Sequence, residues 1–106
     1  MVALSKTTKA GQEQIACLFR VLGNDTRMRI LHDLATGEKC VCNIFKRLKL
    51  PQNLVSHHLG ILRKNGLIRS RRAGKWVYYS LEGKQLAHVA AVVHGILKAP
   101  KGQPAC

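Results

Sequence analysis

The sequence predicts a mainly α-helical fold with one β-hairpin, because its apolar residues have helical spacing along most of the chain and alternate in only one stretch. The alternating stretch, LIRSRRAGKWVYYSL, has a glycine near its middle, which is typical of two strands joined by a tight turn. Before and after it, apolar residues recur three and four positions apart. The expected elements are helices at residues 12–22, 26–35, 41–48, 51–65 and 83–97 and strands at residues 68–72 and 76–81.

A chain of 106 residues suits one domain, which we expect to span residues 1–106 with polar tails at 1–10 and 98–106. Its last helix contains no Asp, Glu, Lys or Arg between Gln85 and Leu97. A helix that is apolar around most of its circumference needs cover on more than one face. We therefore expect a twofold homodimer formed through the first and last helices. The alternative is burial of the last helix within one chain.

The balance of charged residues indicates a nucleic-acid partner. The 18 Lys and Arg outnumber the 5 Asp and Glu and leave a net charge of +13, which favours an anionic polymer. No segment is long and apolar enough to cross a bilayer, and the N-terminus lacks the apolar core of a signal peptide, so we expect a cytoplasmic location. The four cysteines, Cys17, Cys40, Cys42 and Cys106, are then expected to be reduced and available for metal or redox chemistry.

The helices at 41–48 and 51–65, joined by a short turn, predict a helix-turn-helix. In the second helix, Val55, Leu59 and Leu62 have the spacing of a buried face, and His58 lies beside them as a packed histidine. The opposite face has no acid, and Gly60 would let DNA approach closely. Its amide, hydroxyl, imidazole and cationic groups can contact bases and phosphates in a major groove. The expected DNA contacts on this helix are Gln52, Asn53, Ser56, His57, Gly60, Arg63 and Lys64.

The hairpin predicts a second DNA contact. Arg69, Arg71, Arg72 and Lys75 cluster around its tip, and we expect Arg71, Arg72 and Lys75 to lie against the DNA backbone or minor groove. A hairpin of this kind beside a helix-turn-helix defines a winged helix-turn-helix. Two copies on a twofold axis would bind a pseudo-palindromic site in double-stranded DNA.

Cys40 and Cys42 stand one residue apart where the helix at 41–48 begins. A helix turns about 100° per residue, so one ideal helix would point the two thiols in nearly opposite directions. One ion can bind both only if this turn starts non-helical or unwinds, and unwinding would move the helix against the DNA-reading one. The alternative is that both cysteines are small buried apolar side chains.

Four stretches together resemble the ArsR/SmtB family of bacterial metal-responsive repressors: LGNDTRMRILHDL, EKCVCNIFKRL, LVSHHLGILRKNGLI and RSRRAGKWVYYSL. The resemblance covers about residues 18–97. It implies a homodimeric repressor that needs no cofactor to bind its operator and leaves it when an ion binds. CVC is similar to the metal box of the arsenic and cadmium members. The arsenic pattern has Asp where this chain has Asn43, and a third cysteine where it has Phe45.

By this resemblance, Cys40 and Cys42 would bind As(III) or Sb(III), with a third ligand from a distant segment. Cys106, on a tail with the reach to cross a dimer, is the preferred third ligand, and Cys17 is the alternative. Soft thiolates also suit Cd(II), Pb(II) and Zn(II), which stay open as inducers. The family's other common metal site lies on the last helix, where only His88 matches, so ligation by His88 or His94 is not expected.

Three other functions are compatible with these features. The thiols could serve a redox- or persulfide-sensing repressor on the same fold. A basic protein of this size could also package nucleic acid and sense nothing. A thiol-disulfide enzyme would need a substrate cleft and a thiol of low pKa, which nothing in the sequence indicates, so we do not expect an enzyme.

Overall fold

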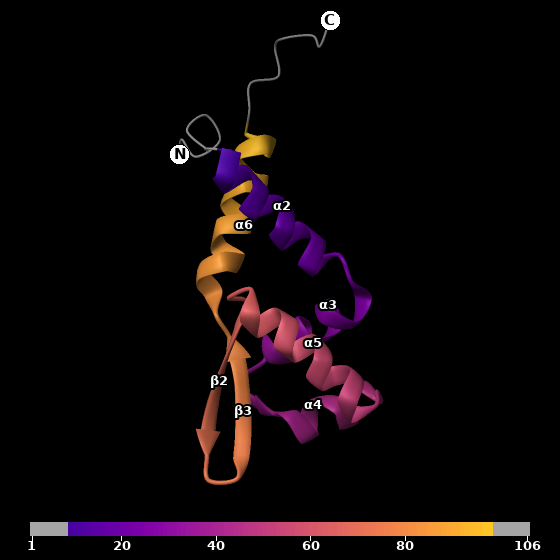
Figure 1. Cartoon of the computed structure of the whole chain (residues 1–106). Helices are drawn as coiled ribbons and strands as arrows, with labels where there is room; N and C mark the ends of the chain where they lie inside the picture. The colour runs from indigo at the N-terminus through magenta and orange to yellow at the C-terminus, as the bar shows by residue number, and fades with distance from the viewer. Residues whose placement is uncertain (1–8, 99–106) are drawn as a thin grey trace, which may run out of the picture.

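The computed structural model describes residues 9–98, in which all the expected helices and both expected strands are present (Figure 1). In chain order the elements are α2 (Lys9–Leu22), α3 (Asp25–Leu34), β1 (Lys39–Cys40), α4 (Val41–Leu48), α5 (Gln52–Lys64), β2 (Ile68–Ala73), β3 (Trp76–Leu81) and α6 (Gly83–Leu97). Figure 1 shows α2 and α6 together at one end of the molecule, with α4 and the β2–β3 hairpin at the other. The fold is the predicted winged helix-turn-helix.

Local side chains and backbone geometry set where the helices begin and end. Asn24 caps α3, because its side-chain oxygen accepts a hydrogen bond from the Arg27 amide at 3.0 Å. Lys49 ends α4 in the left-handed conformation, with φ of 57°. Gly66 follows α5 with φ of 75°, a conformation that glycine adopts readily at the end of a helix. Pro51 is the N-cap of α5 and lies just outside the helix that we expected it to begin.

A third strand extends the hairpin into a sheet of order β1-β3-β2. β1 pairs antiparallel with β3, placing Lys39 opposite Tyr79 and Cys40 opposite Tyr78. The sequence did not predict β1, because two residues are too few to show an alternating pattern. This short strand matters for the site, since it holds Cys40 against the wing.

One face of α5 packs into the hydrophobic core and holds the helix in place. Val55, Leu59 and Leu62 are fully buried, as predicted, in a cluster that includes Ile30 of α3 and Ile44 of α4. Full burial of each such side chain stabilises the fold by roughly 1.5–3 kcal/mol. The opposite face of α5 is therefore held rigidly toward solvent.

The last helix is only partly covered within the chain. Val89 and Val92 of α6 are buried, whereas Val93, Ile96 and Leu97 are 38%, 58% and 65% exposed.

The described part of the chain contains no helix with the length and apolar character needed to cross a membrane.

Candidate nucleic-acid interface and thiol site

The predicted DNA-reading face of α5 is open to solvent. A Cβ added at Gly60 would meet no atom within 4 Å, so the helix backbone there can be approached closely. The α5 residues expected to contact DNA are all exposed: Gln52, Asn53, Ser56, His57, Gly60, Arg63 and Lys64. The arrangement brings amide, hydroxyl, imidazole and cationic groups onto one surface without an acid.

His58 is a structural residue, as the sequence predicted. It is buried, and its Nδ1 accepts a hydrogen bond from Nε of Arg27 at 3.1 Å. Burial lowers the pKa of His58, and the charges of Arg27 and His57 lower it further. The His58 imidazole therefore links α3 to α5 behind the predicted DNA-reading face.

The three wing residues expected to contact DNA are also exposed. Lys75 lies at the tip, with its ammonium 5.9 Å from the centre of the Trp76 ring. Arg72 is exposed on β2. Arg71 differs from both, because its guanidinium already forms an ion pair with Glu38, at 2.7 Å between Nη2 and Oε1.

The two thiols of the CVC stretch face each other, with 3.4 Å between the Sγ atoms of Cys40 and Cys42. Cys40 ends β1 and is the N-cap of α4, with extended backbone angles of φ −73° and ψ 148°. Cys42 lies in the first turn of α4. The two residues therefore do not share a helix, and the helix need not unwind to bring their thiols together. Of the two routes that the sequence left open, the structure supports the non-helical start.

The contact between the thiols affects their ionisation. Cys42 donates its S–H toward the sulfur of Cys40, and this hydrogen bond is the main reason that the pKa of Cys42 is raised. Desolvation raises the pKa of Cys42 as well, whereas the Lys46 charge opposes the rise. An ion that binds both sulfurs must displace protons. The same raised pKa makes Cys42 a poorer thiolate nucleophile toward oxidants.

The structure does not place a third ligand beside the thiol pair within the described part of one chain. Among residues 9–98, no group of three His, Cys, Asp or Glu side chains is arranged to hold a metal ion. Cys17 lies on α2, where its Sγ is 3.9 Å from Oδ1 of Asn65 at the end of α5. Cys106 lies outside the described residues. His88 and His94 are both exposed on α6.

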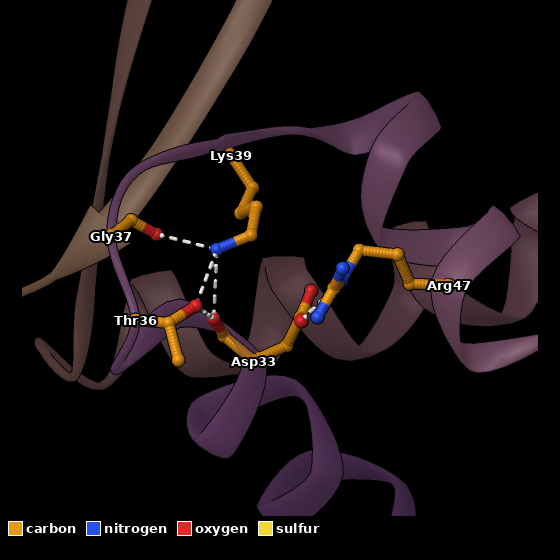
Figure 2. A network of polar contacts seen from close by, with 5 residues as sticks. All are labelled: Asp33, Thr36, Gly37, Lys39 and Arg47. Carbon is orange, nitrogen blue, oxygen red and sulfur yellow. Dashed lines mark hydrogen bonds and ion pairs between the residues drawn. The ribbon is translucent and has the colours of Figure 1, made fainter.

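A polar network that the sequence did not reveal anchors the segment before the thiols (Figure 2). The Lys39 ammonium donates to Thr36 Oγ1 at 2.7 Å and to the carbonyl oxygens of Asp33 and Gly37 at 3.0 and 3.2 Å. The buried Asp33 carboxylate accepts a 2.7 Å hydrogen bond from Arg47 Nε on α4. Together these contacts fix β1 and α4, the two elements that carry the thiols, to the end of α3.

Comparison with known proteins shows the family. A sequence model described as bacterial regulatory protein, arsR family, matches residues 24–70. An HTH-type transcriptional regulator of Methanocaldococcus jannaschii is 39% identical over 82 residues, covering 76% of this chain and 92% of that protein. The arsenic resistance transcriptional regulator ArsR2 of Pseudomonas putida is 37% identical over 83 residues, covering 77% of this chain and 72% of that protein. The chain belongs to the ArsR family.

One further relative and one solved structure are also similar to this chain. A CadC homologue of Staphylococcus aureus, named as a cadmium resistance regulatory protein, is 35% identical over 79 residues, which is 74% of this chain and 65% of that protein. A homodimeric winged helix-turn-helix DNA-binding domain from Mycobacterium bovis is 31% identical with a TM-score of 0.71, covering 92% of this chain and 90% of that domain. As an ArsR-family member, the chain is a DNA-binding transcriptional regulator, and the expectation that it is not an enzyme is confirmed.

Proposed function

We propose that this chain is a homodimeric repressor that leaves its operator when a thiophilic ion binds Cys40 and Cys42. The observation that carries the proposal is the 3.4 Å contact between the two thiols at the start of α4, the helix that supports α5. As(III) or Sb(III) is the favoured inducer, and Cd(II), Pb(II) and Zn(II) are the alternatives. The arsenic and cadmium regulators among the relatives support this range.

Two sulfurs do not complete a site for these ions. A bound ion would supply a positive centre that holds both thiolates. Cys40 and Cys42 fit two of its positions, since they are soft donors that already face each other. We assign the third position to Cys106, with Cys17 of either subunit as the alternative.

DNA binding is assigned to the exposed face of α5 and to the wing, without any cofactor. Asn53, Ser56 and His57 would reach base edges or phosphates, and Arg72 and Lys75 would lie along the backbone. The dimer would form through α2 and α6, where Val93, Ile96 and Leu97 are left exposed by the single chain. Such a dimer would bind operator DNA in the cytoplasm.

The contacts around α4 give a route from the thiols to the DNA. Cys42 belongs to the first turn of α4. Ile44, two residues later in the same helix, is fully buried in the cluster that holds Leu59 of α5. A change in the position of Cys42 therefore alters the packing between α4 and α5. Release follows if the ion-bound arrangement docks less well on DNA.

The test is release of operator DNA, titrated with As(III), Sb(III), Cd(II), Pb(II) and Zn(II), in the wild type and in four single Cys→Ser variants. We expect Cys40→Ser and Cys42→Ser to bind the operator but to lose release. Cys106→Ser should require more ion, and Cys17→Ser should behave as the wild type. A Cys40→Ser variant that is released normally by arsenite would overturn the proposal.

The same samples distinguish the remaining functions. Release by hydrogen peroxide in metal-free buffer, but not by any ion, would indicate a redox-sensing repressor; the raised pKa of Cys42 argues against it. Equal affinity for operator and random DNA, with or without ion, would indicate a packing protein.

A further inference from the structure

Glu38 lies beside the wing, one residue before β1. The pairing of β1 and β2 with β3 places Cys40 and Arg71 on either side of Tyr78, in one row across the sheet. Glu38 is two residues before Cys40, and from there its side chain reaches across to Arg71. Its carboxylate accepts two hydrogen bonds, from Nε at 2.9 Å and from Nη2 at 2.7 Å.

This geometry is the one a guanidinium uses for phosphate. Two parallel N–H donors match two oxygens of a carboxylate or of a phosphate equally well, so the two anions require the same edge of Arg71. The Arg71 side chain is 57% exposed and the Glu38 side chain 35%, so a DNA backbone could reach both. The guanidinium also lies 4.9 Å from the centre of the Tyr78 ring, which holds it near the sheet surface.

The acid is unusual in its setting. The chain has 5 acidic residues against 18 Lys and Arg, and two of those acids, Glu38 and Glu82, lie beside arginines of β2. Of these two, Glu38 is the one whose carboxylate accepts two hydrogen bonds from its arginine. A carboxylate at this place repels an approaching phosphate when it is free and occupies Arg71 when it is paired. Either effect opposes DNA binding by the wing.

We propose that Glu38 competes with the DNA backbone for Arg71, so that the wing engages DNA only when Arg71 exchanges the carboxylate for a phosphate. The inference rests on the proposed function to the extent that the wing contacts the operator. It makes Glu38 a positioning residue that limits operator affinity.

The exchange has a signature in the salt dependence of binding. When Arg71 leaves Glu38 for a phosphate, the freed carboxylate regains counterions and offsets those that the phosphate releases. Without the carboxylate, each Arg71–phosphate contact contributes fully, and the slope of log K against log salt steepens by at most about 0.9 per subunit, the contribution of one phosphate. Because an exposed ion pair is weak, removing its competition should raise the affinity for operator DNA by only a small factor, roughly two- to fivefold at low salt.

The experiment measures operator and random-DNA affinity over a salt series for the wild type, Glu38→Gln, Arg71→Gln and the double variant. Glu82→Gln is the matched control, because it removes the same charge from a position beside the same sheet: Glu82 follows β3 as the N-cap of α6, and its carboxylate lies 3.6 Å from Arg69 of β2. We expect Glu38→Gln to bind the operator two- to fivefold more tightly with a steeper slope, a larger change than in Glu82→Gln. In the Arg71→Gln background, Glu38→Gln should have no more effect than Glu82→Gln.

Three results would overturn the inference. Weaker binding by Glu38→Gln would mean that the carboxylate presents Arg71 to DNA. An equal gain in Glu38→Gln and Glu82→Gln, or an undiminished gain in the double variant, would mean that only net charge acts. Failure of the proposed function is seen separately, as a wild type that does not distinguish operator from random DNA.

Discussion

At the scale of single residues, the proposed DNA-reading face contains a glycine, a residue that helices normally disfavour. Gly60 lies in the interior of α5, where glycine costs roughly 1 kcal/mol relative to alanine. The surrounding space is empty, so packing does not explain its presence. A bare backbone at this point is useful if another molecule must come close to it.

Gly60→Ala should therefore separate stability from binding. We expect the free energy of unfolding to rise by about 0.5–1 kcal/mol, because alanine favours the helix and meets no neighbour. Operator affinity should fall, since the added methyl group points toward the groove. Urea unfolding and fluorescence anisotropy measure the two quantities. A variant that binds the operator as tightly as the wild type would show that this face does not enter the groove.

His58 predicts a pH dependence of stability. Its pKa is lowered from the ordinary 6.5 in the folded chain, mainly by burial, whereas the unfolded chain keeps the ordinary value. As pH falls through 6.5, the unfolded chain takes up a proton that the folded chain does not, so the free energy of unfolding falls. Urea unfolding at pH 7.5, 6.5 and 5.5 should show a smaller fall in His58→Gln, which can still accept from Arg27. An equal fall in both proteins would contradict this.

At the scale of elements, the strand-to-helix junction at Cys40 brings the thiols together. The sequence predicted α4 and α6 with the bounds that the structure has. A clear apolar period defines α4, and a stretch without Asp, Glu, Lys or Arg from Gln85 to Leu97 marks most of α6. The sequence also predicted both faces of α5. It could not predict β1, or the thiol contact that follows from it, because two residues carry no period and the pairing with β3 is long-range. Lys39 was missed for another reason. Its oxygen partners lie only two to six residues earlier in the chain, but they converge on the ammonium through the shape of the turn after α3, which no apolar pattern reports.

Lys39 should be important for the stability of this junction. Lys39→Met removes the hydrogen bonds to Asp33, Thr36 and Gly37 and should lower the free energy of unfolding by about 1–2 kcal/mol. The matched control is Lys46→Met, an exposed lysine of α4, which should change it by less than about 0.5 kcal/mol. Urea unfolding of both variants measures the difference. Equal values would mean that the network does not hold β1.

At the scale of the whole molecule, the chain leaves apolar surface at one end and cationic surface at the other. Figure 1 shows α6 extending away from the helix-turn-helix and the wing, alongside α2. Ile96 and Leu97 are more than half exposed there, which is unfavourable for a monomer in water. A dimer through this end would direct two copies of α5 and the wing toward one DNA duplex.

Ile96→Glu tests this assembly. Burying an unpaired carboxylate in a dimer interface should weaken the dimer at least about tenfold, or about 1.4 kcal/mol, as measured by sedimentation velocity over a dilution series. The control is Leu54→Glu, which places the same carboxylate at an exposed position of α5, away from the proposed interface. It should leave the dimer as stable as in the wild type. A dimer as stable as the wild type in Ile96→Glu would show that this part of α6 is not in the interface.

The most direct test of the account follows ion binding and DNA release in one titration. Arsenite is added to the protein on fluorescent operator DNA while ultraviolet absorption reports bonds between thiolate and ion and anisotropy reports release. We expect the two signals to change together in the wild type and to vanish together in Cys40→Ser. DNA release that precedes the absorption change, or that persists in Cys40→Ser, would contradict control of the DNA-reading helix by the thiol pair.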